Sequence, residues 1–231
     1  MRFSQFEAIL SHERLKRYVD ACNQDHRKAM TLYRYNLHLA QDAFSIISCF
    51  EISLRNAIDR QLTSQFGADW LRDSIQPGGI FDGPRFRETQ RIVRKAYDRL
   101  QNSGQYTHTQ LLSEMEFGVW KYMFSAQQYA ATGQTLLRAV FPLRPRSSAA
   151  FQYNNTYIFN ELDKINVLRN RIAHHEPICF TYHNNGADTT HIRREYAKIL
   201  TLFSWMNIDC HSLLYGLDHV LKVSDKIDGL N

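Results

Sequence analysis

The first 66 residues contain no glycine and no proline, and residues 35–66 carry the clearest helical pattern in the chain. Apolar side chains recur there at helical spacing, so that they share one face. Gly67 follows, and glycine commonly ends a helix. The segment predicts one long amphipathic helix whose buried face comprises Ala40, Phe44, Ile47, Leu54, Ile58 and Leu62.

A second core helix is predicted over residues 149–175, and Pro177 stops it. Its apolar stripe consists of Ile158, Leu162, Ile165 and Ile172. Further helical patterns cover residues 4–31, 85–102, 109–130 and 191–217. Glycine and proline together number 15 of 231 residues, too few for a turn-rich β protein.

These patterns predict an all-α fold, a helical bundle that forms a single domain over residues 1–231. Gly118, inside the 109–130 pattern, is expected to mark the close approach of another helix. The net charge of +5 and the sequence pI of about 9.0 permit an acidic partner such as RNA without requiring one.

The four cysteines are far apart and form no zinc-ligand spacing, so we expect reduced thiols and a cytoplasmic protein. No signal segment and no apolar run long enough to span a membrane is present. No set of carboxylates suits two-metal catalysis, and we expect neither a metal nor another cofactor.

The 85–102 helix is basic, and four of its cations cluster on one side. Such a row can follow the phosphates of a nucleic acid, which makes it a candidate RNA-binding surface. The alternative is an ordinary solvated face, with Glu88 and Asp98 as partial partners. The four residues are Arg87, Arg91, Arg94 and Lys95.

Residues 168–178, LRNRIAHHEPI, combine an arginine with histidines at the end of a predicted helix. Arg169 lies on the apolar stripe, where an unpaired charge is costly. Arginine binds phosphate oxygens through a planar, permanently charged fork, and histidine moves protons near neutral pH. Arg169, Asn170, His174 and His175 are therefore candidates for phosphate chemistry. The alternative is that these cations merely favour a helix C-terminus.

Glu51 lies between Ile47 and Leu54 on the predicted apolar face of the long helix. A carboxylate in that position needs a cation or hydrogen-bond donors. We expect a buried contact with Arg55 or with Arg169.

Three segments resemble the Abi-like family of bacterial abortive-infection proteins, which belongs to the HEPN superfamily of helical nucleic-acid enzymes. They are LYRYNLHLAQDAFSIISCFEISLRNAIDRQL (32–62), SEMEFGVWKYMF (113–124) and KINVLRNRIAHHEPI (164–178). The resemblance implies a HEPN-like bundle with extra helices. It also implies metal-independent RNA cleavage, with two copies of the third motif meeting in a homodimer.

The resemblance implies that Arg169, Asn170 and His174 are the catalytic residues. His175 fits a looser spacing between the arginine and the histidine of the motif. Glu51 matches an acidic position on an earlier helix. The implied function is an endoribonuclease of phage defence, acting as a toxin that a regulatory RNA or an antitoxin protein holds in check. Two alternatives remain open: a non-catalytic RNA-binding module of the same fold, and a structural helical dimer in which Arg169 and Glu51 form a buried polar network.

Overall fold

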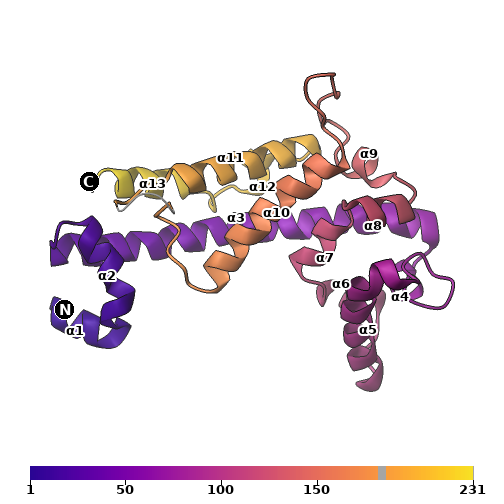
Figure 1. Ribbon diagram of the computed structural model, residues 1–231, viewed down its shortest axis with the longest axis horizontal. Coiled ribbons are helices and arrows are strands. Elements are labelled where there is room, and N and C mark those ends of the chain that lie inside the picture. The colour runs from indigo at the N-terminus through magenta and orange to yellow at the C-terminus, as the bar shows by residue number, and fades with distance from the viewer. Residues whose placement is uncertain (182–185, 231) are drawn as a thin grey trace. The chain divides into compact units, whose positions relative to one another are not determined.

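The computed structural model describes residues 1–181 and 186–230, and in these residues it contains helices and no strand (Figure 1). The all-α prediction is confirmed. The longer helices are α1 (Phe3–Leu10), α2 (His12–Ala21), α3 (His26–Phe66), α5 (Arg87–Asn102), α10 (Asn155–Ala173), α11 (Thr190–Trp205) and α13 (Val220–Asp228). The short ones are α4 (Trp70–Asp73), η1 (Pro84–Phe86), α6 (His108–Ser113), α7 (Phe117–Tyr122), α8 (Ala126–Ala131), α9 (Leu136–Val140) and α12 (Cys210–Leu213).

Helix α3 begins nine residues before the predicted start, because the Asp25 carboxylate caps it by accepting hydrogen bonds from the backbone N–H groups of Arg27 and Lys28. It ends where predicted, at Gly67, whose φ of +99° favours glycine. The predicted buried face needs correction: Phe44 is 43% exposed and Ala40 is half-buried. The buried stripe lies to one side of them and includes Leu39, Ala43, Ile46, Ile47, Phe50, Leu54, Ile58 and Leu62.

The chain divides into two compact units, and both α3 and α10 contribute residues to each. The expectation of a single domain over 1–231 stays a prediction. The first unit comprises residues 1–49, 167–201 and 209–231, and the second comprises residues 50–166 and 202–208.

Four helices supply the core of the first unit. Side chains from α3, α10, α11 and α13 surround one small apolar space, among them Ala43, Ile47, Leu168, Ile199 and Val220. Helices α3 and α10 therefore pack against each other here.

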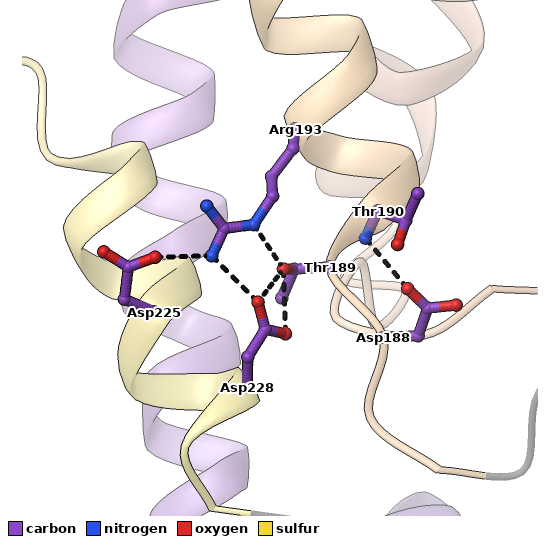
Figure 2. A network of polar contacts seen from close by, with 6 residues as sticks. All are labelled: Asp188, Thr189, Thr190, Arg193, Asp225 and Asp228. Carbon is purple, nitrogen blue, oxygen red and sulfur yellow. Dashed lines mark hydrogen bonds and ion pairs between the residues drawn. The ribbon is translucent and has the colours of Figure 1, made fainter.

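A polar network joins α13 to the start of α11 (Figure 2). Arg193 donates to Asp225 at 2.7 Å and to Asp228 at 2.8 Å, and its Nε donates to the Thr189 hydroxyl at 2.8 Å. Thr189 in turn donates to the Asp228 carboxylate. Beside it, the Asp188 carboxylate accepts from the backbone N–H of Thr190 at the first turn of α11. These bonds hold the C-terminal helix in the first unit.

Aromatic rings dominate the core of the second unit. Phe50 of α3 contacts Phe117 of α7 and Phe203, with centroid separations of 6.4 and 5.2 Å. The buried ammonium of Lys121 donates to Asp163 of α10 at 2.7 Å. Helices α4, α5 and α6 pack together (Figure 1). Helix α8 contacts η1.

Three predicted helices differ from the structure. The 109–130 segment is broken into α6, α7 and α8, because it has too many buried apolar residues for one helix face: Leu111, Leu112, Met115, Phe117, Val119, Trp120, Met123 and Phe124. Residues 149–154 are not helical, since Asn154 caps α10 by accepting from the Tyr157 N–H. The 191–217 helix ends at Trp205, and Asn207 follows with a φ of 59°.

None of the helices among the described residues has the length and apolar character needed to cross a lipid bilayer. All four cysteines are free thiols, as expected; Cys22 and Cys179 are buried, and Cys49 and Cys210 are half-buried. Burial raises the pKa of the Cys179 thiol to about 12, which makes it a poor nucleophile.

Candidate functional site

The two histidines of the LRNRIAHHEPI segment lie in the turn that closes α10, just beyond its last helical residue, Ala173. The backbone N–H of His175 donates to the Ile172 carbonyl at 2.9 Å, and that of Glu176 donates to the Arg171 carbonyl at 2.8 Å. This pair of bonds is the Schellman pattern that satisfies the last carbonyls of a helix.

His175 occupies the left-handed position of this turn, with a φ of 57°. Glycine is usual there, because a Cβ atom disfavours the left-handed conformation. Both His174 and His175 are exposed, so their imidazole rings are open to a ligand.

Arg169 is half-buried on α10, and its Nε atom is buried with no hydrogen-bond partner in the described part of the chain. Buried donors are nearly always satisfied, so an orphaned guanidinium nitrogen requires an explanation. Asn170 is exposed one residue later and lies one helical turn from His174, so the two side chains share a flank. The end of α10 therefore combines a fixed cation with an unused donor, an amide and an accessible imidazole.

Side chains that the sequence reasoning missed fix the segment after the histidines. The Asn36 side-chain oxygen, buried on α3, accepts from the backbone N–H groups of Ile178 at 2.9 Å and Cys179 at 3.1 Å. The sequence signal for this contact is Asn36 itself, a polar residue on the buried stripe of α3.

Two arginines hold carbonyl groups of the same turn. Arg14 of α2 donates to the His175 carbonyl at 2.6 Å. Arg171, only 7% exposed, donates to the Pro177 carbonyl at 2.7 Å, and its Nε lies 3.4 Å from the Glu176 carboxylate. The turn that carries both histidines is thus anchored from α2 and α10.

A third histidine, His191, lies in the electrostatic field of Arg171 and Arg194. Burial lowers the pKa of His191 from its ordinary value of 6.5, and the charges of Arg194 and Arg171 act in the same direction, against Glu195. Arg194 Nη2 lies 2.9 Å from His191 Nδ1. A guanidinium only donates, so in this contact Nδ1 accepts, as it does in a neutral ring.

Glu51, the candidate acidic residue, is half-buried on the part of α3 that belongs to the second unit. The expected buried contact of Glu51 with Arg55 or with Arg169 stays a prediction. Arg55 is half-buried, and its Nε donates to the neighbouring Asn56 at 3.2 Å.

The four candidate RNA-binding cations are all exposed on α5, and their clustering as one RNA-binding surface stays a prediction. Arg91 and Lys95 line a cavity, together with Arg85 and Arg99. Arg87 and Arg94 do not line it, and Arg94 donates to the Ile75 carbonyl at 2.6 Å. Arg91 also pairs with Glu88, with an Nε–Oε2 distance of 3.0 Å.

The family model described as Abi-like protein matches residues 1–179, which include the α3 segment, the FG-containing segment of α7 and the end of α10. No curated protein and no solved structure matches the chain.

Proposed function

Because the chain belongs to the Abi-like protein family, we propose that it is an endoribonuclease of bacterial phage defence that cleaves RNA without a metal ion. The catalytic residues would be Arg169, Asn170 and His174, with His175 and Glu51 in supporting positions. The protein would act as a homodimer that places two copies of the motif in one cleft, and a regulatory RNA or an antitoxin protein would restrain it.

The chemistry requires few groups, because RNA carries its own nucleophile in the 2′-hydroxyl. A base removes the 2′-hydroxyl proton, the 2′-oxygen attacks the adjacent phosphorus, and the bond from phosphorus to the 5′-oxygen breaks. An acid protonates the leaving 5′-oxygen, so the products are a 2′,3′-cyclic phosphate and a 5′-hydroxyl. His174 supplies the base or the acid, and Arg169 stabilises the charge on the phosphate oxygens.

The observation that carries the proposal is a half-buried arginine, Arg169, five residues before the exposed His174 at the end of α10. Such an arginine can bind a phosphate oxygen, since charge-assisted bonds from arginine to phosphate are strong and directional.

The decisive experiment incubates the purified chain with end-labelled tRNA in EDTA, beside the His174→Ala and Arg169→Ala variants. We expect cleavage by the unmodified protein and losses of roughly 100-fold or more for each variant. RNA binding should fall less for His174→Ala than for Arg169→Ala, because only arginine contacts phosphate with a permanent charge.

The products should end in a 2′,3′-cyclic phosphate, and DNA of the same sequence should stay intact. Full cleavage by the double variant His174→Ala, His175→Ala would refute the ribonuclease. RNA binding without any cleavage would instead support a non-catalytic RNA-binding module.

A further inference from the structure

A cavity with a volume of about 960 Å³ lies wholly within the second unit. One wall is α5 with η1, and the other is formed by residues 114–128. The volume falls within the range of small-molecule sites, about 300–1,000 Å³. Neither the histidines nor Arg169 line it.

The α5 wall is cationic. Arg91, Lys95 and Arg99 follow one another at intervals of four residues, so they form a row along the helix with a rise of about 6 Å between neighbours. Arg91 is paired with Glu88 and Arg99 with Glu114. Lys95 and Arg85 have no ion-pair partner among the described residues, and both are exposed to the cavity. The α5 wall therefore carries two positive charges that no carboxylate of the described residues pairs with.

The opposite wall presents hydrogen-bond acceptors and an aromatic ring. Glu114 and Glu116 supply carboxylates, and Gln127 supplies an amide. Rings line the cavity on both sides, Phe86 from η1 and Tyr122 from α7. A ligand that spans the two walls needs an anionic end, a flat apolar body and an edge that donates hydrogen bonds.

Gly118 supplies a second, independent observation. We expected this glycine to mark the close approach of another helix, but that expectation is wrong: a Cβ atom built there would meet no atom within 4 Å. Its φ lies outside the left-handed region, so the backbone does not require glycine either. Glycine weakens a helix, yet here it leaves the α7 wall of the cavity bare. A glycine at position 118 is better explained by the open space that it leaves for a ligand than by close packing of another helix.

We infer that this cavity binds a nucleotide, either free or as a unit of single-stranded RNA. Phosphate would lie against the row of cations, and the base would stack on Phe86 or Tyr122, as bases do in single-strand sites. Amino and imino groups of the base would donate to Glu116 and Gln127, the pairing that carboxylates make with base edges.

The test measures binding to the full chain carrying His174→Ala, so that cleavage cannot interfere. The probes are fluorescent single-stranded RNAs of about six nucleotides, the four nucleoside monophosphates, and inorganic phosphate. Lys95→Gln removes an unpaired cation, and Gly118→Leu fills the cavity. Arg138→Gln is the matched control, because Arg138 is exposed in the same unit but does not line the cavity.

We expect Lys95→Gln and Gly118→Leu each to weaken binding by about tenfold, and Arg138→Gln to change it by less than about twofold. Tighter binding of monophosphates than of RNA would identify a free nucleotide as the ligand, and the reverse would identify a strand. Should Gly118→Leu lower the melting temperature, Arg85→Gln replaces it, since Arg85 is exposed.

Equal losses for Lys95→Gln and Arg138→Gln would overturn the inference, because they would show diffuse attraction between charges. Binding of neither monophosphates nor RNA would overturn it as well. Both outcomes are distinguishable from a failure of the proposed ribonuclease, which is judged by cleavage alone.

Discussion

His175 combines an exposed imidazole with a left-handed backbone in the turn that closes α10. Non-glycine residues in this conformation carry a conformational cost, and they concentrate at functional sites. The residue therefore has two separable properties, its ring and its backbone angle, and substitution can test each one.

Replacing His175 by glycine should raise the free energy of unfolding by roughly 0.5–1 kcal/mol, because glycine adopts a φ of this sign without a steric penalty. His175→Ala removes the same ring but keeps the Cβ atom. Chemical denaturation measures stability, and the tRNA assay measures cleavage. If His174 is the catalytic histidine, both His175 variants should cleave more RNA than His174→Ala. Inactive His175 variants of full stability would transfer the catalytic role to His175.

His191 predicts a stability change with pH. Its pKa is lowered in the folded chain, so between that value and about 6.5 the unfolded chain binds more protons than the folded one. The contribution of the neutral ring is thus complete above pH 6.5 and is lost as the pH falls through the folded pKa. His191→Gln should flatten the decrease in unfolding free energy between pH 7 and pH 5, measured by urea titration. Parallel pH profiles for the two proteins would contradict this assignment.

At the scale of elements, the motif depends on a contact between α3 and the segment that follows α10. Asn36 satisfies two backbone N–H groups with one side-chain oxygen. Because Asn36 is only 3% exposed, water cannot easily replace it. The catalytic proposal thus requires α3 for the geometry of the turn, although α3 carries none of the three principal motif residues.

Asn36→Ala should lower the free energy of unfolding by about 2–4 kcal/mol, since two buried donors lose their acceptor. RNA cleavage should fall as well, because the turn that carries His174 and His175 loses its anchor. Asn36→Asp keeps an acceptor at the same position and serves as the control. Hydrogen exchange at Ile178 and Cys179 measures the effect directly. Unchanged protection of these two amides in Asn36→Ala would show that the contact is not needed.

In the first unit, large apolar side chains are exposed on α3 and on α10, the helix whose end carries the motif. Leu37 and Phe44 are seven residues apart on α3, hence on one side of the helix, and Val167 is exposed on α10. Exposed apolar residues that gather on one element mark interaction surfaces. They support the proposed homodimer, whose twofold contact must be complementary to itself.

Phe44→Glu should shift the chain from dimer to monomer and abolish cleavage, while changing the stability of the monomer by less than about 0.5 kcal/mol. Light scattering after gel filtration measures the mass. Leu213→Glu is a matched control, because Leu213 is an apolar residue of similar exposure on α12. A Phe44→Glu dimer, or a monomer that still cleaves RNA, would refute the proposed assembly.

Three features can be predicted from the sequence alone: the helical class, the end of α3 before Gly67 and the place of the motif at the end of α10. These features depend on local properties: the spacing of apolar residues, the absence of glycine and proline, and the backbone preference of glycine. These properties act over a few residues, so they can be recognised in the sequence without knowing which other segments pack against the helix.

Which of several similar residues is buried or paired depends, in contrast, on the tertiary structure. Arg169 and Arg171 are two residues apart, yet Arg169 is half-buried, whereas Arg171 is only 7% exposed and donates to the Pro177 carbonyl. The cations of α5 divide between the cavity wall and the outside for the same reason. Burial and pairing depend on what packs against a helix, and those partners come from distant parts of the chain, as Asn36 shows for the turn at Ile178.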